Sequence, residues 1–434
     1  MPHVDNSFLT FVKKLMTQPA SSDVRSAIAC PFCGMACDDL DVRTDEAEVF
    51  VLAKGCARSV AMFRLPLDAA QGQCFIDGKP VELSEAVARA AAILGAAHQP
   101  LVGGLGADVA GARAALQLAN RIGAVVDHMN SRALMRNLAV LQDSGWVITT
   151  FAEVQNRADL VVVVGTDVVS RFPRFFERVL GDRESMFTEG AVQREMVYLG
   201  TNPESLSWRA DQIITCNNPG EAFAALRALL GGRALQCEVA GGIPVQQLQA
   251  LAERMRAAKY GVLVWAAADL DFAHAELHIQ AMCNLVADLN VHTRFAVLPL
   301  GGSDGDITAN QVTLWQTGFP LRVGFGAGSL NYDPLHYSTE RLLKQGEADA
   351  LLWISAFDAE RRPPACNIPV VVFGRPGMRF SAPPAVYIPV AVPGIHHAGH
   401  FFRSDSVVAL RLRKLIDSSL PAVADVLGQI ERML

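Results

Sequence analysis

The stretch Leu160-Val161-Val162-Val163-Val164-Gly165 decides the fold class. Five consecutive apolar residues, most of them β-branched, are typical of a strand that is buried on both faces. Similar runs occur at 101–106, 196–200, 261–267, 294–300, 350–355 and 369–374. Stretches rich in Ala and Leu at helical spacing lie at 83–97, 110–122, 221–230, 245–258 and 273–289. Alternation of such strands and helices predicts an α/β fold with parallel sheets that are covered on both faces.

The composition predicts several domains around a large core. The chain has 434 residues, and at about 150 residues per domain this length corresponds to two to four domains. Hydrophobic residues make up 51% and charged residues only 19%, which suggests that partner subunits cover part of the surface. The formal net charge of −6 argues against nucleic acid or an anionic membrane as a partner, because both favour a basic surface.

Three further observations favour the cytoplasm. No run reaches the roughly 18 apolar residues that a membrane-spanning helix needs. Asp5, Lys13 and Lys14 interrupt the apolar residues of segment 1–20, which argues against a secretory signal peptide. The nine cysteines are too few for a disulfide scaffold of this length, and their odd number with four crowded together indicates a metal site in a reducing compartment.

The crowded cysteines form a C-x2-C-x3-C run, Cys30, Cys33 and Cys37, followed by Cys56. Four thiolates with two close spacings and a distal fourth can hold a tetrahedral metal ion or a 4Fe-4S cluster. Zinc fits less well, because the first three cysteines lie within eight residues instead of forming two C-x2-C pairs. The alternative is four unrelated buried cysteines.

The same segment resembles a known family. Cys-Pro-Phe-Cys-Gly-Met-Ala-Cys-Asp-Asp at 30–39, with Gly55-Cys56 after it, resembles the N-terminus of the B-type subunit of formylmethanofuran dehydrogenase, a molybdopterin or tungstopterin oxidoreductase. Further similar segments are 151–159, Phe172-Pro173-Arg174 and 394–405, so the resemblance covers nearly the whole chain. It implies that a 4Fe-4S cluster is bound by Cys30, Cys33, Cys37 and Cys56.

The sequence departs from the active members of this family at the metal ligand. Those proteins supply a Cys or selenocysteine to molybdenum or tungsten, and Ala133 stands at the matching position here, within segment 126–135. The nearest cysteines outside the cluster motif are Cys74 and Cys216. A methyl group cannot bind a metal, so the sequence predicts no catalytic residue in this chain and argues against a metal–pterin cofactor.

This pattern is similar to the B-type subunits of the bacterial formyltransferase/hydrolase complex of methylotrophs. The resemblance implies a scaffold in tetrahydromethanopterin-linked one-carbon oxidation, the route of formaldehyde oxidation, with the chain itself not catalytic. The implied partners are the hydrolase, formyltransferase and C-type subunits, and a methanofuran-type carrier is a further candidate contact. The 4Fe-4S cluster would then be structural, a relic or an electron relay, and these interpretations stay open.

Two other functions remain as alternatives. The first is a redox-active formylmethanofuran dehydrogenase subunit with tungstopterin or molybdopterin. The second is a 4Fe-4S electron-transfer subunit. Ala133 separates the scaffold from the first alternative, because the redox subunit needs a ligand there.

Several other patterns point to less specific chemistry. Arg171, Arg174 and Arg178 would share one face of a helix and form either a basic groove for an acidic carrier tail or a solvated face. His274 and His278 have the i, i+4 spacing of zinc ligands, but the composition of that helix favours ordinary histidines. The remaining candidates are the histidines at 396, 397 and 400 and the glycine-rich loops 103–106, 301–306 and 324–328.

The predicted architecture is therefore a small N-terminal iron–sulfur module followed by two interleaved parallel-sheet α/β domains of the molybdopterin oxidoreductase type. The family's C-terminal β-barrel domain is expected to be missing, which itself implies a partner chain. The module is predicted at 1–78, the first α/β domain at 79–130 and 303–434, and the second at 131–302.

Overall fold

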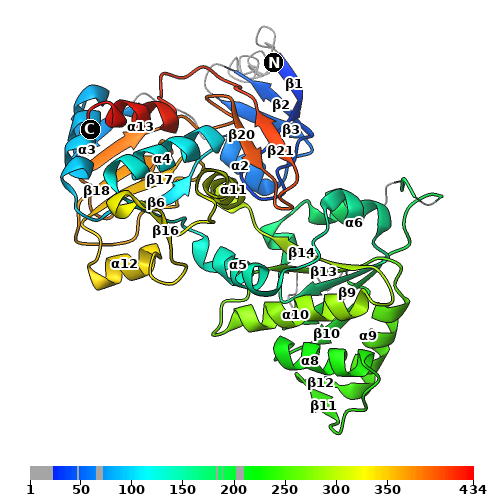
Figure 1. Ribbon diagram of the computed structural model, residues 1–434. Helices are drawn as coiled ribbons and strands as arrows, with labels where there is room; N and C mark the ends of the chain where they lie inside the picture. Colours follow the sequence, from blue (N-terminus) through cyan, green and yellow to red (C-terminus); the bar gives the residue numbers. More distant parts are fainter. Residues whose placement is uncertain (1–22, 46–47, 65–71, 182–183, 188, 202–209) are drawn as a thin grey trace, which may run out of the picture.

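A computed structural model describes residues 23–45, 48–64, 72–181, 184–187, 189–201 and 210–434. Two α/β lobes and a smaller N-terminal part are visible in Figure 1. The segment 1–20, for which the sequence argues against a signal peptide, lies outside the described residues. In the described part of the chain, no helix is long and apolar enough to cross a membrane.

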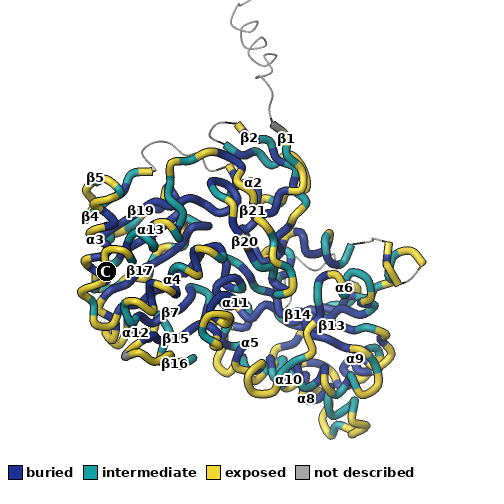
Figure 2. The backbone as a smooth tube through the Cα atoms, turned by 45° about the horizontal axis from the view of Figure 1, so that its top comes forward, coloured by how far each residue is buried: buried dark blue, intermediate teal, exposed yellow. Residues whose placement is uncertain are grey.

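One lobe is built on a wholly parallel five-stranded sheet that contains the Leu160 strand. Alternate residues of that strand face opposite sides: Val161 and Val163 join one core cluster, and Val162 and Val164 join another. Both sides of the strand are packed, and all five of its residues are buried. Figure 2 shows the neighbouring strands β13 and β14 of this sheet as buried. In order, the strands are β10 (Gln212–Thr215), β9 (Glu195–Gly200), β8 (Leu160–Val164), β13 (Gly261–Ala266) and β14 (Phe295–Leu300). The helices of this lobe are α5 (Ser131–Ser144), α6 (Phe151–Arg157), α7 (Val168–Arg171), η2 (Phe176–Leu180), α8 (Pro219–Leu230), α9 (Val245–Ala257) and α10 (Ala275–Leu289), with a small hairpin of β11 (Val239–Ala240) and β12 (Ile243–Pro244).

The other lobe is built on a nine-stranded mixed sheet with a parallel centre and antiparallel edges. In order, its strands are β16 (Asn331–Tyr332), β15 (Val323–Gly324), β7 (Val125–Val126), β6 (Pro100–Gly106), β17 (Ala350–Ser355), β18 (Val370–Gly374), β19 (Val386–Pro389), β4 (Cys74–Ile76) and β5 (Lys79–Val81). The helices α3 (Leu83–Ala96), α4 (Val109–Ile122), α11 (Asp306–Thr317) and α13 (Val423–Glu431) contribute to one core cluster, and α12 (Thr339–Gln345) lies against the other face. Short 3-10 turns are η4 (Ser303–Gly305) and η5 (Gly326–Gly328).

The α/β class and the predicted strands and helices are confirmed, with element ends shifted by one or two residues. A mixed α/β molecule with two largely parallel sheets is what the buried strands and amphipathic helices predict. One strand departs from the predicted division of the chain. Cys74–Ile76, placed with the N-terminal module, pairs antiparallel with β19 and extends the large sheet.

The N-terminal part is a three-stranded antiparallel sheet followed by one helix. Its elements are β1 (Asp23–Ile28), β2 (Leu40–Thr44), β3 (Val49–Ala53) and α2 (Ala57–Phe63). The cysteine loop connects β1 to β2, and its apolar residues share a core cluster with the five-stranded sheet. A C-terminal hairpin, β20 (Gly399–Phe402) and β21 (Ala409–Leu412), lies beside this part in Figure 1.

The cysteine loop touches the loop after β14 backbone to backbone. A Cβ atom on Gly34 would lie 1.6 Å from the carbonyl oxygen of Gly301, and one on Gly302 would lie 2.6 Å from the Cα of Gly34. Ser404 closes the junction: its N–H donates to the Gly34 carbonyl at 2.8 Å, and its hydroxyl accepts from the Gly301 N–H at 2.8 Å. Only glycine at position 34 permits this approach.

We therefore expect Gly34→Ala to destabilise the protein by about 1–3 kcal/mol, because the methyl group must displace backbone atoms. Gly428→Ala is the matched control, since a Cβ there meets nothing closer than 3.6 Å within α13. Thermal unfolding followed by circular dichroism measures both variants. Equal melting of Gly34→Ala and wild type would show that the loops are not in contact.

Candidate functional site

The cysteine loop is closed on itself by its own backbone. The Cys30 N–H donates to the Cys37 carbonyl at 2.7 Å, and the Ala36 N–H donates to the Cys33 carbonyl at 3.1 Å. Cys56 lies at the N-cap of α2, where its sulfur accepts a hydrogen bond from the Ser59 N–H at 3.4 Å. These local bonds fix the direction in which each thiol points.

The four thiols are electrostatic neighbours. Burial raises the pKa of the Cys30 thiol, and the Cys33, Cys37 and Cys56 thiols raise it further. Burial first, and the Cys33 thiol second, raise the pKa of Cys37 to about 12. Burial also raises the pKa of Cys33, so the Cys30, Cys33 and Cys37 thiols stay protonated unless a cationic centre binds them as thiolates.

The donor set fits an iron–sulfur cluster. It consists of sulfur atoms alone, and the backbone N–H groups of Phe32 and Met35 point at the Cys30 and Cys33 sulfurs, as hydrogen bonds to cluster thiolates do. Within the described ranges, no three His, Cys, Asp or Glu side chains lie close enough to hold a single metal ion.

The three arginines do not form a basic groove or a solvated face. Arg174 is paired with Asp39 at 2.7 Å and with Glu177, and Arg178 is paired with Asp38 at 2.6 Å. Only 5% of the Arg174 side chain is exposed. The helical face that the spacing predicts is also absent, since α7 ends at Arg171 and a separate π-helix, η2, carries Arg178. Both sequence interpretations are therefore wrong for Arg174 and Arg178, which dock the aspartates after Cys37 onto the second lobe. Arg171 is exposed and is paired with Asp269.

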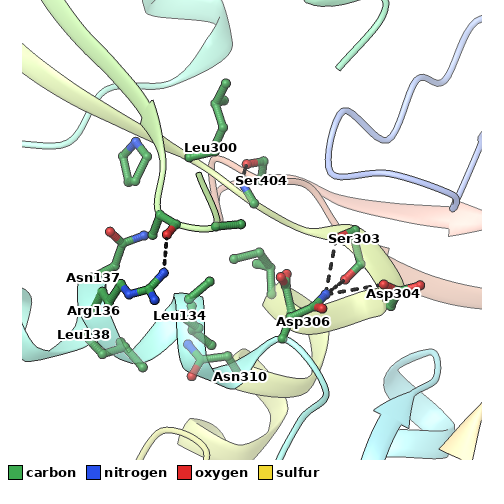
Figure 3. A pocket seen from close by; sticks show the side chains of 18 of the residues that line it. Leu134, Arg136, Asn137, Leu138, Leu300, Ser303, Asp304, Asp306, Asn310 and Ser404 are labelled. Carbon is green, nitrogen blue, oxygen red and sulfur yellow. Dashed lines mark hydrogen bonds between the residues drawn. The ribbon is translucent and has the colours of Figure 1, made fainter. Parts of the chain in front are cut away.

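A cavity of about 750 Å³ lies where α5, α11 and the ends of β13 and β14 meet (Figure 3). Ala133 lines this cavity, with Leu134 and Leu138 on the same helix. No cysteine is among the residues that line it. Position 133 thus stands where a ligand could reach a cavity-bound metal, and it presents a methyl group there.

The cavity lies next to the cysteine loop. Arg58, two residues after Cys56, lines the cavity, and its charge lowers the pKa of both the Cys33 thiol and the Asp304 carboxyl. Burial outweighs this effect, so the pKa values of both groups are raised overall. Arg58 therefore acts electrostatically on both the cysteine loop and the cavity.

The polar wall of the cavity comes from the loop after β14 and the start of α11. Asp304 accepts hydrogen bonds or ion pairs from Asn130 at 3.4 Å and Arg361 at 3.0 Å. His128 supports this loop, because its Nε2 lies 3.2 Å from the Asp304 carbonyl oxygen while its Nδ1 accepts from the Asn130 N–H. Burial lowers the pKa of His128 to about 4, so the imidazole is neutral.

Asp306 and Asn310 are residues that the sequence did not single out individually. Both line the cavity from one face of α11 and are less than a tenth exposed. In the described part of the chain, nothing donates a hydrogen bond to Oδ1 of either side chain. Burial, and then the charge of Asp304, raise the pKa of Asp306 to about 7. The sequence could have indicated this pair only by the spacing of two polar residues one helical turn apart.

A second cavity of about 760 Å³ adjoins the first and shares Met129, Arg132 and Arg361 with it. Its buried charges, Asp127 and Arg322, face each other at 3.5 Å. The two cavities together follow the junction between the lobes.

The histidines that the sequence singled out have local roles. His278 Nδ1 accepts a hydrogen bond from the Gly220 N–H at 3.0 Å, and His274 lies near Glu276 on the surface. His396 Nδ1 accepts from the Val392 N–H at 2.9 Å, which fixes the turn before β20. His397 Nδ1 lies 2.9 Å from the Ala398 carbonyl oxygen.

Comparison with known proteins confirms the resemblance that the motifs indicate. No family model matches the chain. The B-type subunit of the tungsten-containing formylmethanofuran dehydrogenase 2 of Methanocaldococcus jannaschii is 28% identical over 406 residues, which cover 90% of this chain and 93% of that protein. The B-type subunit of the formyltransferase/hydrolase complex Fhc of Methylorubrum extorquens is 28% identical over 331 residues, which cover 74% of this chain and 85% of that protein.

A solved structure shows the same relationship. A chain in the crystal structure of the formyltransferase/hydrolase complex FhcABCD from Methylorubrum extorquens, in complex with methylofuran, superposes with a TM-score of 0.71. It is 28% identical and covers 83% of this chain and 98% of its own length. The chain is thus similar both to subunits named for a tungsten enzyme and to a component of a formyltransferase/hydrolase complex.

The raised pKa of Asp306 predicts a pH-dependent stability. The folded state holds this proton up to about pH 7 while the unfolded state releases it near 3.8, so stability falls as the pH rises between these values. Asp306→Asn cannot ionise and removes this loss, so the variant gains on the order of 1–4 kcal/mol over wild type at pH 8 and little at pH 4.

Urea unfolding at pH 4, 6 and 8 measures the difference. Asp143→Asn is the control, because Asp143 is exposed on α5 and its replacement is expected to be neutral at every pH. If Asp306→Asn lost stability equally at all three values, the aspartate would be ionised and paired in the folded protein.

Proposed function

We propose that this chain is the B-type subunit of a formyltransferase/hydrolase complex, in which it acts as a scaffold without a metal–pterin redox site. The observation that carries the proposal is the place of Ala133, in the wall of the cavity between the lobes. Similarity over nearly the whole chain to subunits of two related complexes supports the architecture, and Ala133 decides between them.

The residues around the cavity do not fit a metal–pterin cofactor. The helix that would present the ligand offers Ala133, Leu134 and Leu138. Of the nearby carboxylates, Asp304 is held by Arg361 and Asn130, and burial raises the pKa of Asp306 to about 7. The alternative of a redox-active tungsten or molybdenum subunit therefore has no support from the donor atoms present.

We also propose the partners that such a complex implies: formyltransferase, hydrolase and C-type subunits in the cytoplasm. Exposed apolar side chains near the junction of the lobes support coverage by another chain. Leu314, Trp315 and Phe319 are exposed by 41%, 58% and 37% on and just after α11. Single exposed apolar residues are ordinary, but a group on one helix end favours an interface.

The three arginines are not the site at which this chain would contact a methanofuran-type carrier. Arg171 is paired with Asp269, and Arg174 and Arg178 are paired with the aspartates after Cys37. Their positive charge is therefore balanced within the chain.

The cysteines would hold a 4Fe-4S cluster with a structural role. Cys30, Cys33 and Cys37 lie in one loop and Cys56 lies beyond a strand pair, so a cluster would tie together a part of the chain that is too small to build its own core. An electron-relay role remains the alternative for the same cluster.

The scaffold proposal is tested by co-expression of this chain with formyltransferase, hydrolase and C-type subunits. We expect one stable assembly that releases formate from formyl-tetrahydromethanopterin without any added electron acceptor. An assembly that forms without this chain and keeps full activity would contradict the scaffold role, as would a requirement for an electron acceptor.

The cluster is tested by anaerobic purification of the full chain. We expect about four iron atoms and four sulfides per chain, and loss of both in Cys33→Ser. Cys283→Ser is the matched control, because Cys283 is also buried but lies in α10 of the other lobe. Wild-type protein with one zinc ion, or equal iron in both variants, would show that these cysteines do not hold a cluster.

A further inference from the structure

We propose that the cavity beside Ala133 binds a small organic cation with paired N–H donors, of the amidinium or guanidinium class, through Asp306 and Asn310. This binding site is additional to the scaffold role and does not depend on it.

The first support is a pair of buried acceptors that lack donors. Asp306 and Asn310 are one helical turn apart on α11, and both point into the cavity (Figure 3). Oδ1 of each accepts no hydrogen bond from the described residues, although 7% and 9% of these residues, respectively, are exposed. A buried acceptor without a donor is costly, and two on one face indicate a donor-bearing ligand.

The second support is the charge balance around Asp306. Arg132 and Arg136 are paired with Asp271, and Arg361 is paired with Asp304. These guanidinium groups line the cavity, and each already has a carboxylate partner, with Asp271 shared by Arg132 and Arg136. Asp306 is thus a buried acid without a cation of its own, and a ligand that supplies one would be bound as an ion pair.

The remaining titratable groups that face the cavity explain why a cation is preferred to an anion. Asp304 and Asp358 add negative charge, and Arg58 on α2 and Arg171 on α7 add positive charge at its edges. Asp269 offsets the charge of Arg171. His128, beneath the loop, is neutral. Of these charges, that of Asp304 acts on Asp306 and raises its pKa, so the position next to Asp306 favours a cation.

The third support is the apolar wall opposite the acceptors. Leu134, Leu138 and Trp146 line the same cavity of about 750 Å³. This volume is within the range of small-molecule sites, which combine an apolar lining with a few polar groups. The ligand is then expected to have an apolar body and a planar cationic end, as in an aryl amidine.

Benzamidine is a suitable probe, with neutral benzamide and anionic benzoate as matched controls. Isothermal titration of the full chain at pH 8 is expected to show benzamidine binding and to show at least about tenfold weaker binding of both controls. Asp306→Asn should weaken benzamidine binding by at least about tenfold, whereas Asp143→Asn should not change it. Binding should also weaken at pH 5.5, where Asp306 is protonated.

Several results would overturn the proposal: no binding of benzamidine to the wild-type chain, equal binding to wild type and Asp306→Asn, or tighter binding of benzoate. Circular dichroism of Asp306→Asn distinguishes loss of the site from loss of the fold, and this variant is expected to be the more stable protein at pH 8. If the co-expression experiment disproved the scaffold role, the expected binding of benzamidine would be unchanged.

Discussion

The contact between the cysteine loop and the loop after β14 holds three distant parts of the chain together. Gly34, Gly301 and Ser404 meet through backbone atoms and two hydrogen bonds of 2.8 Å. The first segment carries the cysteines, the second leads from the five-stranded sheet into α11, and the third belongs to the C-terminal hairpin region. The cavity and the cysteine cluster are neighbours because this junction admits no side chain.

The cavity presents a methyl group at position 133, where the resemblance led us to expect a metal ligand in redox-active relatives. Ala133 and two leucines form the wall at which the related redox enzymes are expected to supply a ligand, while Asp306 and Asn310 keep buried oxygens without donors. A protein that only needed to fill this space would gain stability from apolar residues at both positions. The presence of these two polar residues is the physical reason to regard the cavity as a binding site in its own right.

The sequence predicted the parts of this molecule that depend on neighbouring residues. Hydrophobic runs located the strands, and the cysteine spacing located the loop that brings the thiols together, because both follow from local periodicity. It did not predict the role of Arg174 and Arg178, whose aspartate partners lie 135 and 140 residues away. It also did not predict that Oδ1 of Asp306 lacks a donor, because a missing donor depends on several other segments at once.

The proposed scaffold role requires a formyl-transferring complex without a metal–pterin centre. Elemental analysis of the anaerobically purified complex, together with fluorescence detection of oxidised pterins, tests this requirement most directly. We predict iron at about four atoms per chain, with tungsten, molybdenum and molybdopterin at background. Tungsten or molybdenum at about one atom per chain, with a matching amount of pterin, would contradict the scaffold role.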